Sequence, residues 1–376
     1  MKNNAALRLM ATALAGMVFL SGCSTLSTVG DAVGSINPFD KSEEQKKAEQ
    51  GDVAGEDKRI SLLALDDTLT VAADVVPDSI VIPDAYVNAD WPQVGGNAVH
   101  VMQHTAASGN LSRLWSKKAG KGSSRKGRVL APPVIAGNRI FVMDGDNRVT
   151  SFDAGNGAKI WDYKVEVTLD GKTREGKTSI IERVTNPLNS SDKGGKDKES
   201  VGGGVAVTGG TVYVTSGLGV IDALDAQSGQ LRWRKRLSTP MHSAPKVAGG
   251  RVFAVSDDNE LFALNAQTGD VLWTYQGIVE SARMLTAPSP AVIDDVVIAP
   301  FASGELVALR VQNGGVLWQD ALSSSGRLTP LSSLNDIASG PVIADGYVIA
   351  TAQSGVMSGF DLRTGQRIWT QPAGSI

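Results

Sequence analysis

The sequence is poor in the residues that most often carry chemistry. It has one cysteine, Cys23, three histidines and only 5% aromatic residues. A single cysteine excludes a disulfide within the chain. The formal net charge of −3 gives no indication of a nucleic-acid partner. The apolar run from Leu9 to Leu20 is shorter than the roughly 20 residues of a membrane-spanning helix.

The sequence also lacks the common catalytic and metal-binding motifs. His100 and His104 are spaced i, i+4, but they lie in a stretch rich in Gly and Asn, without the pattern of a zinc-binding helix. Asp144 begins a segment that resembles a calcium loop, yet Gly155 stands where the final glutamate is needed. Nucleophile-elbow and Walker spacings are missing as well. We therefore predict no catalytic residue, no bound metal and no cofactor.

The amino terminus has the pattern of a bacterial lipoprotein signal. Lys2 and Arg8 precede the apolar run, which ends in Leu20-Ser-Gly-Cys23. This segment resembles a lipobox, which implies that residues 1–22 are removed and that the Cys23 thiol is lipidated. Ser24 in place of Asp implies sorting to the outer membrane. A buried free thiol is the alternative for Cys23. Residues 23–60 are small and polar, and we expect a flexible tether.

One pattern recurs roughly every 40–50 residues, which is the spacing of β-propeller blades. Each copy has a polar or charged residue, four further residues ending in Gly, and a Trp four residues after that Gly. The five copies begin at Asp153, Asp225, Asn265, Arg310 and Asp361 and lead to Trp161, Trp233, Trp273, Trp318 and Trp369. The segment suits a tight hairpin turn, and the regular tryptophans are expected to pack between blades.

Short alternating stretches precede each copy and complete four strands per repeat, A to D. The clearest are Arg139–Val142, Thr211–Val214, Arg251–Ala254 and Tyr347–Ala350. The sequence thus predicts an all-β propeller of four-stranded blades over residues 61–376, with a polar insertion at 162–202. Trp115 is expected on the outer strand of a further blade. With five complete blades and one orphan strand, the chain looks like a C-terminally truncated version of a longer protein.

The repeat resembles that of the quinoprotein (PQQ) propellers, and together with the lipobox it resembles the BamB family of lipoproteins. That family implies an eight-bladed propeller at the periplasmic face of the outer membrane. It also implies a non-catalytic role in the β-barrel assembly complex, with the BamA POTRA domains, other Bam subunits and unfolded outer-membrane protein clients as partners. Two alternatives stay open: a membrane-anchored PQQ dehydrogenase and a polysaccharide-binding propeller. The dehydrogenases use a vicinal Cys-Cys ring, which a single cysteine rules out.

Connections from strand D of one blade to strand A of the next emerge on one face of a propeller. Here they carry Met241, Arg283, Met284, Leu285, Leu334, Asp336 and Ile337. Apolar side chains mixed with charges on such a face are typical of a protein-binding site. We predict a partner site at Arg283, Met284, Leu285 and Asp336, and the BamB resemblance implies the same loops. The alternative is that Met284 and Leu285 fold inward as part of the core.

Overall fold

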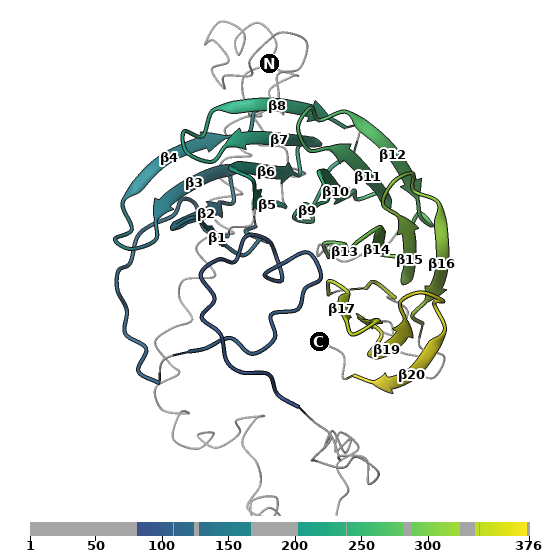
Figure 1. Cartoon of the computed structure of the whole chain (residues 1–376). Coiled ribbons are helices and arrows are strands. Elements are labelled where there is room, and N and C mark those ends of the chain that lie inside the picture. Colours follow the sequence, from purple (N-terminus) through teal and green to yellow (C-terminus); the bar gives the residue numbers. More distant parts are fainter. Residues whose placement is uncertain are drawn as a thin grey trace, which may run out of the picture. The chain divides into compact units, whose positions relative to one another are not determined.

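The repeats form five four-stranded antiparallel sheets arranged around an axis (Figure 1). The computed structural model describes residues 81–107, 109–123, 128–166, 202–237, 239–280, 288–323, 335–337 and 339–373. None of the described residues forms a helix long and apolar enough to cross a membrane. The predicted all-β propeller of four-stranded blades is confirmed.

Each blade takes four strands that follow one another along the chain, and each strand pairs with the next. Blade 1 is β1 (Val134–Ala136), β2 (Arg139–Met143), β3 (Arg148–Asp153) and β4 (Lys159–Lys164); blade 2 is β5 (Gly203–Thr208), β6 (Thr211–Ser216), β7 (Val220–Asp225) and β8 (Leu231–Arg236); blade 3 is β9 (Lys246–Ala248), β10 (Arg251–Val255), β11 (Glu260–Asn265) and β12 (Val271–Gln276); blade 4 is β13 (Ala291–Ile293), β14 (Val296–Pro300), β15 (Glu305–Arg310) and β16 (Val316–Ala321); blade 5 is β17 (Val342–Ala344), β18 (Tyr347–Ala352), β19 (Val356–Asp361) and β20 (Arg367–Pro372).

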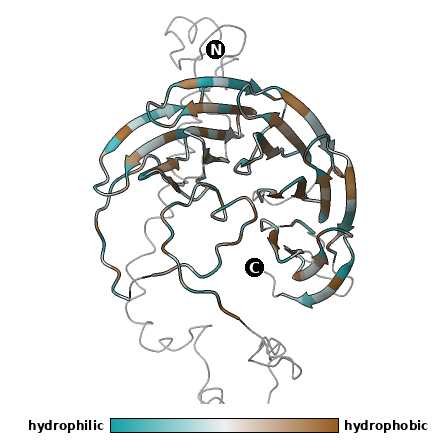
Figure 2. Cartoon of the chain, viewed as in Figure 1, coloured by the Kyte–Doolittle hydropathy of each residue, from teal (hydrophilic) through white to brown (hydrophobic). Residues whose placement is uncertain are grey.

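The first strand of each blade, A, is innermost and the fourth, D, is outermost (Figure 1). Strands B and C are mostly buried, and β6 is fully buried. The D strands alternate between exposed and partly buried residues, as β12 does. Apolar residues are accordingly concentrated in the inner strands (Figure 2). The core therefore lies between neighbouring sheets, where each blade packs against the next.

The start of the predicted insertion is corrected by the strand bounds. Strand β4 continues to Lys164, so the first residues assigned to the insertion at 162–202 belong to blade 1. Strand β5 begins at Gly203. Residues 167–201 and the predicted signal peptide and tether, 1–22 and 23–60, lie outside the described residues.

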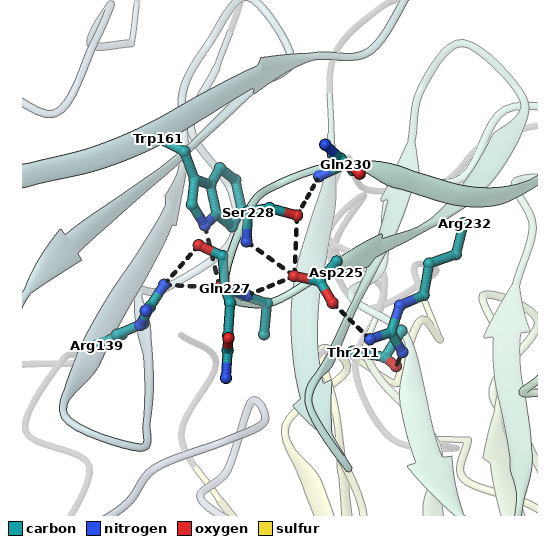
Figure 3. Close-up of polar contacts among 9 residues, drawn as sticks. Arg139, Trp161, Thr211, Asp225, Gln227, Ser228, Gln230 and Arg232 are labelled. Carbon is teal, nitrogen blue, oxygen red and sulfur yellow. Dashed lines mark hydrogen bonds and ion pairs between the residues drawn. The ribbon is translucent and has the colours of Figure 1, made fainter.

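The hairpin turn between strands C and D is built by the first residue of the repeated pattern. In blade 2, Asp225 Oδ1 accepts hydrogen bonds from Gln227 N at 2.9 Å and Ser228 N at 2.8 Å (Figure 3). Arg232 donates to the other carboxylate oxygen at 2.6 Å. These hydrogen bonds lower the pKa of Asp225, and the bond from Arg232 has the largest effect. Gly229 closes the turn at φ 72°, a conformation that glycine adopts without strain.

Four of the five tryptophans of the pattern join their blade to the next one. Trp161 Nε1 donates to the carbonyl of Ala226 at 3.0 Å (Figure 3). Its ring lies against Gly229 of blade 2. A Cβ at Gly229 would lie 2.6 Å from this ring, so only glycine fits. The same bond joins Trp233 to Ala266, Trp273 to Val311 and Trp318 to Leu362, at 3.0, 2.9 and 2.8 Å. The predicted packing of these tryptophans between blades is thus observed.

Trp115 occupies the same position relative to blade 1. Its Nε1 donates to Ala154 O at 2.9 Å, and its ring lies against Gly157. The segment around Trp115 has no strand assignment, although we predicted an outer strand there. Its tryptophan nevertheless takes the place of a D-strand Trp from a preceding blade. The predicted outer strand at Trp115 is therefore wrong, although the side chain makes the contact of a D-strand Trp.

Candidate partner-binding face

Most residues of the predicted partner site lie outside the described residues. These residues are Arg283, Met284 and Leu285. The predicted lipidation site, Cys23, also lies outside the described residues. Asp336 is described and is 2% exposed. Its backbone carbonyl accepts a hydrogen bond from Gln353 N at 2.8 Å, which ties the connection to blade 5. Asp336 is thus buried and its backbone helps to hold the connection on blade 5. Its side chain could contact a partner only if the connection moved.

Two apolar residues that we expected on the loop face point into the core instead. Met241, in the connection before β9, is completely buried in the cluster shared by blades 2 and 3. Ile337, in the connection before β17, is 1% exposed and packs in the cluster of blades 4 and 5. Burying these side chains fills the gap between neighbouring blades at the end of each core. At these two positions the connections serve the fold.

The connection from β12 to β13 behaves differently where it is described. Ile278 and Val279 are 58% and 65% exposed. The backbone is nevertheless held in place, because Ile278 N donates to Glu305 Oε2 at 2.7 Å and Gly277 N donates to Asn259 O at 2.8 Å. Two adjacent apolar side chains exposed on a fixed backbone offer area that a partner can desolvate. Ile278 was missed from sequence because it lies only two residues after strand D and resembles a strand residue.

An axial cavity of about 320 Å³ opens among the starts of the A strands. Its walls come from all five blades, and its lining residues are Val94, Gly95, His100, Leu130, Ala131, Pro132, Gly203, His242, Ala244, Pro288, Ser289 and Gly340. His242 Nδ1 lies 2.9 Å from Asp257 Oδ1, which orients its ring. His100 was considered with His104 from their spacing, but the structure places it with His242 in this cavity.

Burial disfavours the protonated, charged forms of His100 and Lys246 beside this cavity. Burial, with a smaller contribution from the nearby Lys246, lowers the pKa of His100 to about 4. The Lys246 side chain is itself buried, which lowers its pKa to about 7. His100 is therefore neutral near pH 7, with Nδ1 donating to Pro341 O at 2.7 Å. Among the described residues, no group of three or more His, Cys, Asp or Glu side chains is arranged to hold a metal ion.

The fold and the contacts between its blades define a PQQ-like β-propeller. The family model described as outer membrane protein assembly factor BamB matches residues 77–192 and 177–376. The chain belongs to this BamB family.

Individual relatives agree with this assignment. The outer membrane protein assembly factor BamB of Yersinia pestis is 30% identical over 265 residues, which cover 70% of this chain and 62% of that protein. That of Escherichia coli K12 is 32% identical over 262 residues, which cover 70% and 61%. The chain spans about three fifths of the length of the curated relatives that it matches.

Solved structures show the same fold. BamB from Moraxella catarrhalis aligns with a TM-score of 0.50 at 19% identity, covering 67% of this chain and 66% of that one. A europium-containing methanol dehydrogenase aligns with a TM-score of 0.54 at 16% identity, covering 76% and 58%. At these identities the likeness concerns the fold alone. The presence of an enzyme among them shows that the propeller itself does not determine function.

Proposed function

We propose that the protein is a non-catalytic scaffold of the outer-membrane β-barrel assembly complex. In this proposal a lipid on Cys23 anchors it at the periplasmic face of the outer membrane. Its D-to-A face binds the BamA POTRA domains, and it assists the folding and insertion of outer-membrane proteins together with other Bam subunits. Membership of the BamB family supports the role in assembly.

The exposed pair Ile278 and Val279 is the observation that carries the proposed site. These residues lead directly into the segment of Arg283, Met284 and Leu285, so one connection holds all five positions. Exposed apolar side chains supply area that is desolvated on binding, and a charged side chain such as Arg283 orients the partner. Asp336 belongs to the next connection and would join the site only after leaving its buried position.

The site is tested by the double substitution Met284→Asp with Leu285→Asp in the full-length protein. We expect the affinity for BamA POTRA domains, measured by titration calorimetry, to fall at least about tenfold, or roughly 1.4 kcal/mol. A matched control is Leu272→Asp on the outer strand β12, because Leu272 is 45% exposed and lies in the same blade. The control should bind normally.

Two outcomes would contradict the assignment. Unchanged affinity of the double variant would show that this connection does not form the site. A large fall in its thermal midpoint would show that Met284 and Leu285 pack in the core. Ile278→Asp provides a second variant, because a side chain that is 58% exposed tolerates a charge without loss of folding.

The anchor is tested separately with Cys23→Ala. We expect this variant to incorporate no labelled fatty acid and to be absent from washed outer membranes. Equal labelling of the variant and the unsubstituted protein would show that Cys23 is not the lipidation site. Binding to POTRA domains in solution should be unaffected, so the anchor and the partner site are tested independently.

A further inference from the structure

A segment without regular secondary structure runs along the inside of the ring of A strands. In Figure 1 it belongs to the dark blue part of the chain at the centre of the blades. Residues Trp91 to His100 make this passage and contact the blades in their order along the chain. We propose that these residues, the axial clasp, are an internal ligand that binds the inner edges of all five A strands and couples the blades into one unit.

The clasp first binds blades 1 and 2 through its backbone. Trp91 and Ile135 of β1 exchange two hydrogen bonds, with N–O distances of 2.7 and 2.9 Å. Val207 N of β5 then donates to Pro92 O at 2.8 Å. All three bonds use the edge of strand A that no other strand of its sheet occupies. The clasp thus satisfies backbone groups that the blades themselves leave unpaired.

At blade 3 the side chain of Gln93 replaces the backbone. Its Nε2 donates to Val247 O at 3.0 Å, and its Oε1 accepts from Val247 N at 2.8 Å. Gln93 is 5% exposed, so bulk water cannot replace the hydrogen bonds of its amide group if they are lost. Lys246 adds bonds from Nζ to Val94 O at 2.7 Å and to Asn97 O at 3.0 Å.

The clasp ends on blades 4 and 5. Val292 N of β13 donates to Ala98 O at 2.8 Å, and Ile343 N of β17 donates to Val99 O at 2.9 Å. His100 completes the contact through its hydrogen bond to Pro341 O. One short segment therefore makes at least one hydrogen bond to every blade.

The sequence of the clasp suits this path. Gly95 has φ 77° and Gly96 has φ 87°, and a Cβ at either would lie within 2.3 Å of the His100 or Met102 side chain. Asn97 Oδ1 accepts from Val99 N at 3.1 Å and Val101 N at 3.2 Å, which bends the chain from blade 3 towards blade 4.

Coupling follows from this arrangement. In repeat proteins each unit contacts only its neighbours, so stability is a sum of local terms. A segment bound to all five blades adds a contact that the blades share. Losing it at one blade should therefore loosen the others as well.

Amide hydrogen exchange of the whole chain tests this with Gln93→Leu. The substitution removes the two bonds between Gln93 and Val247 at blade 3, and it leaves the Lys246 bonds and those of the other blades in place. We expect the amides of Val207, Val292 and Ile343, which donate to the clasp from three other blades, to exchange at least tenfold faster. The matched control is Asp90→Ala, which removes only an exposed bond to Gly137 N and should leave these amides unchanged. Faster exchange confined to Val247 would overturn the proposal.

A second measurement keeps the test valid if Gln93→Leu fails to fold. A protease site is inserted between the exposed residues Asn110 and Leu111 of the otherwise unsubstituted protein, and the chain is cut after folding. The clasp should remain bound to the blades in gel filtration and on mass analysis of the folded fraction. Release of the fragment with an unchanged thermal midpoint of the remaining chain would overturn the proposal.

Discussion

The outer ring and the axis hold the same five blades together in different ways. At the outer ring one contact is repeated, since the tryptophan of each boundary donates to a carbonyl in the next hairpin turn and lies against its glycine. At the axis only the donor is repeated, because one backbone N–H of each A strand donates to the clasp. The acceptor is a backbone carbonyl at four blades and the Gln93 side chain at blade 3. The outer ring therefore repeats both the donor and the acceptor of its contact, whereas the axis repeats only the donor.

Within the five blades and the described connections between them, exposed apolar residues divide in a similar way. Ile160, Leu272 and Ile368 each precede a strand-D tryptophan and are 41–50% exposed. Their recurrence in successive blades marks them as part of the repeat. Ile278 and Val279 have no such equivalents and are more exposed, at 58% and 65%. This contrast is why the proposed partner site is placed on the connection and not on the outer strands.

Trp161→Ala should have the largest effect on stability. The side chain is 8% exposed and loses its packing against Gly229 as well as its hydrogen bond. Removing a buried aromatic ring costs about 3–5 kcal/mol. Urea unfolding measures this loss, and the neighbouring Ile160→Ala, at an exposed position, should cost less than about 1 kcal/mol. Equal effects of the two substitutions would show that the repeated tryptophans do not hold the outer ring.

Acid should weaken the axis through His100. Its pKa is about 4 in the folded protein and 6.5 ordinarily, so the unfolded chain binds the proton more readily between these values. Stability from this group is present above pH 6.5 and is lost as the pH falls towards 4, by on the order of 3 kcal/mol.

Unfolding of His100→Gln at pH 7 and pH 4.5 measures this contribution. The variant should lose less stability on acidification than the unsubstituted protein. His104→Gln, at an exposed position, serves as the control and should change nothing. An identical acid response of the His100 variant and the unsubstituted protein would remove His100 as the acid-sensitive group of the axis.

The smallest effect is expected where one repeat departs from the others. Arg310 takes the place of Asp or Asn in the hairpin turn of blade 4, although its backbone makes the same bonds to Gly314 and Gly315. Arg310→Asp should supply the missing side-chain acceptor and stabilise the protein by about 0.5–1 kcal/mol. Thermal unfolding measures the gain, with Gln312→Asp as a control, because it adds an aspartate at an exposed position of the same turn. A loss of stability would show that the turn acceptor does not stabilise the repeat.

The repeated part of the structure, which comprises the blades with their hairpin turns and tryptophans, was largely predictable from sequence. The strand predicted at Arg139–Val142 is observed as Arg139–Met143, and that at Tyr347–Ala350 as Tyr347–Ala352. The turn and tryptophan contacts were predicted because each recurs, so five weak signals support one conclusion. Even Trp115, which has no strand around it, was placed by its position in the repeat.

The unrepeated half was not predictable in the same way. The clasp binds mainly through backbone atoms, which leave no residue signature, and Gln93 alone does not indicate a bond to Val247. The residue types of Met241 and Ile337 do not reveal whether their side chains turn inward or outward. They are buried because the gap between two neighbouring blades accommodates them. The proposed site therefore rests on the exposed start of the β12–β13 connection and on family membership.

Hydrogen exchange of the whole chain with and without the BamA POTRA domains tests the proposed recognition most directly. The account predicts slower exchange on binding in the connection that follows Gly277 and precedes β13, with little change in the outer strands β8, β12 and β16. Protection along those outer strands, with none in the connection, would contradict it and would place the partner on the repeated rim of the propeller.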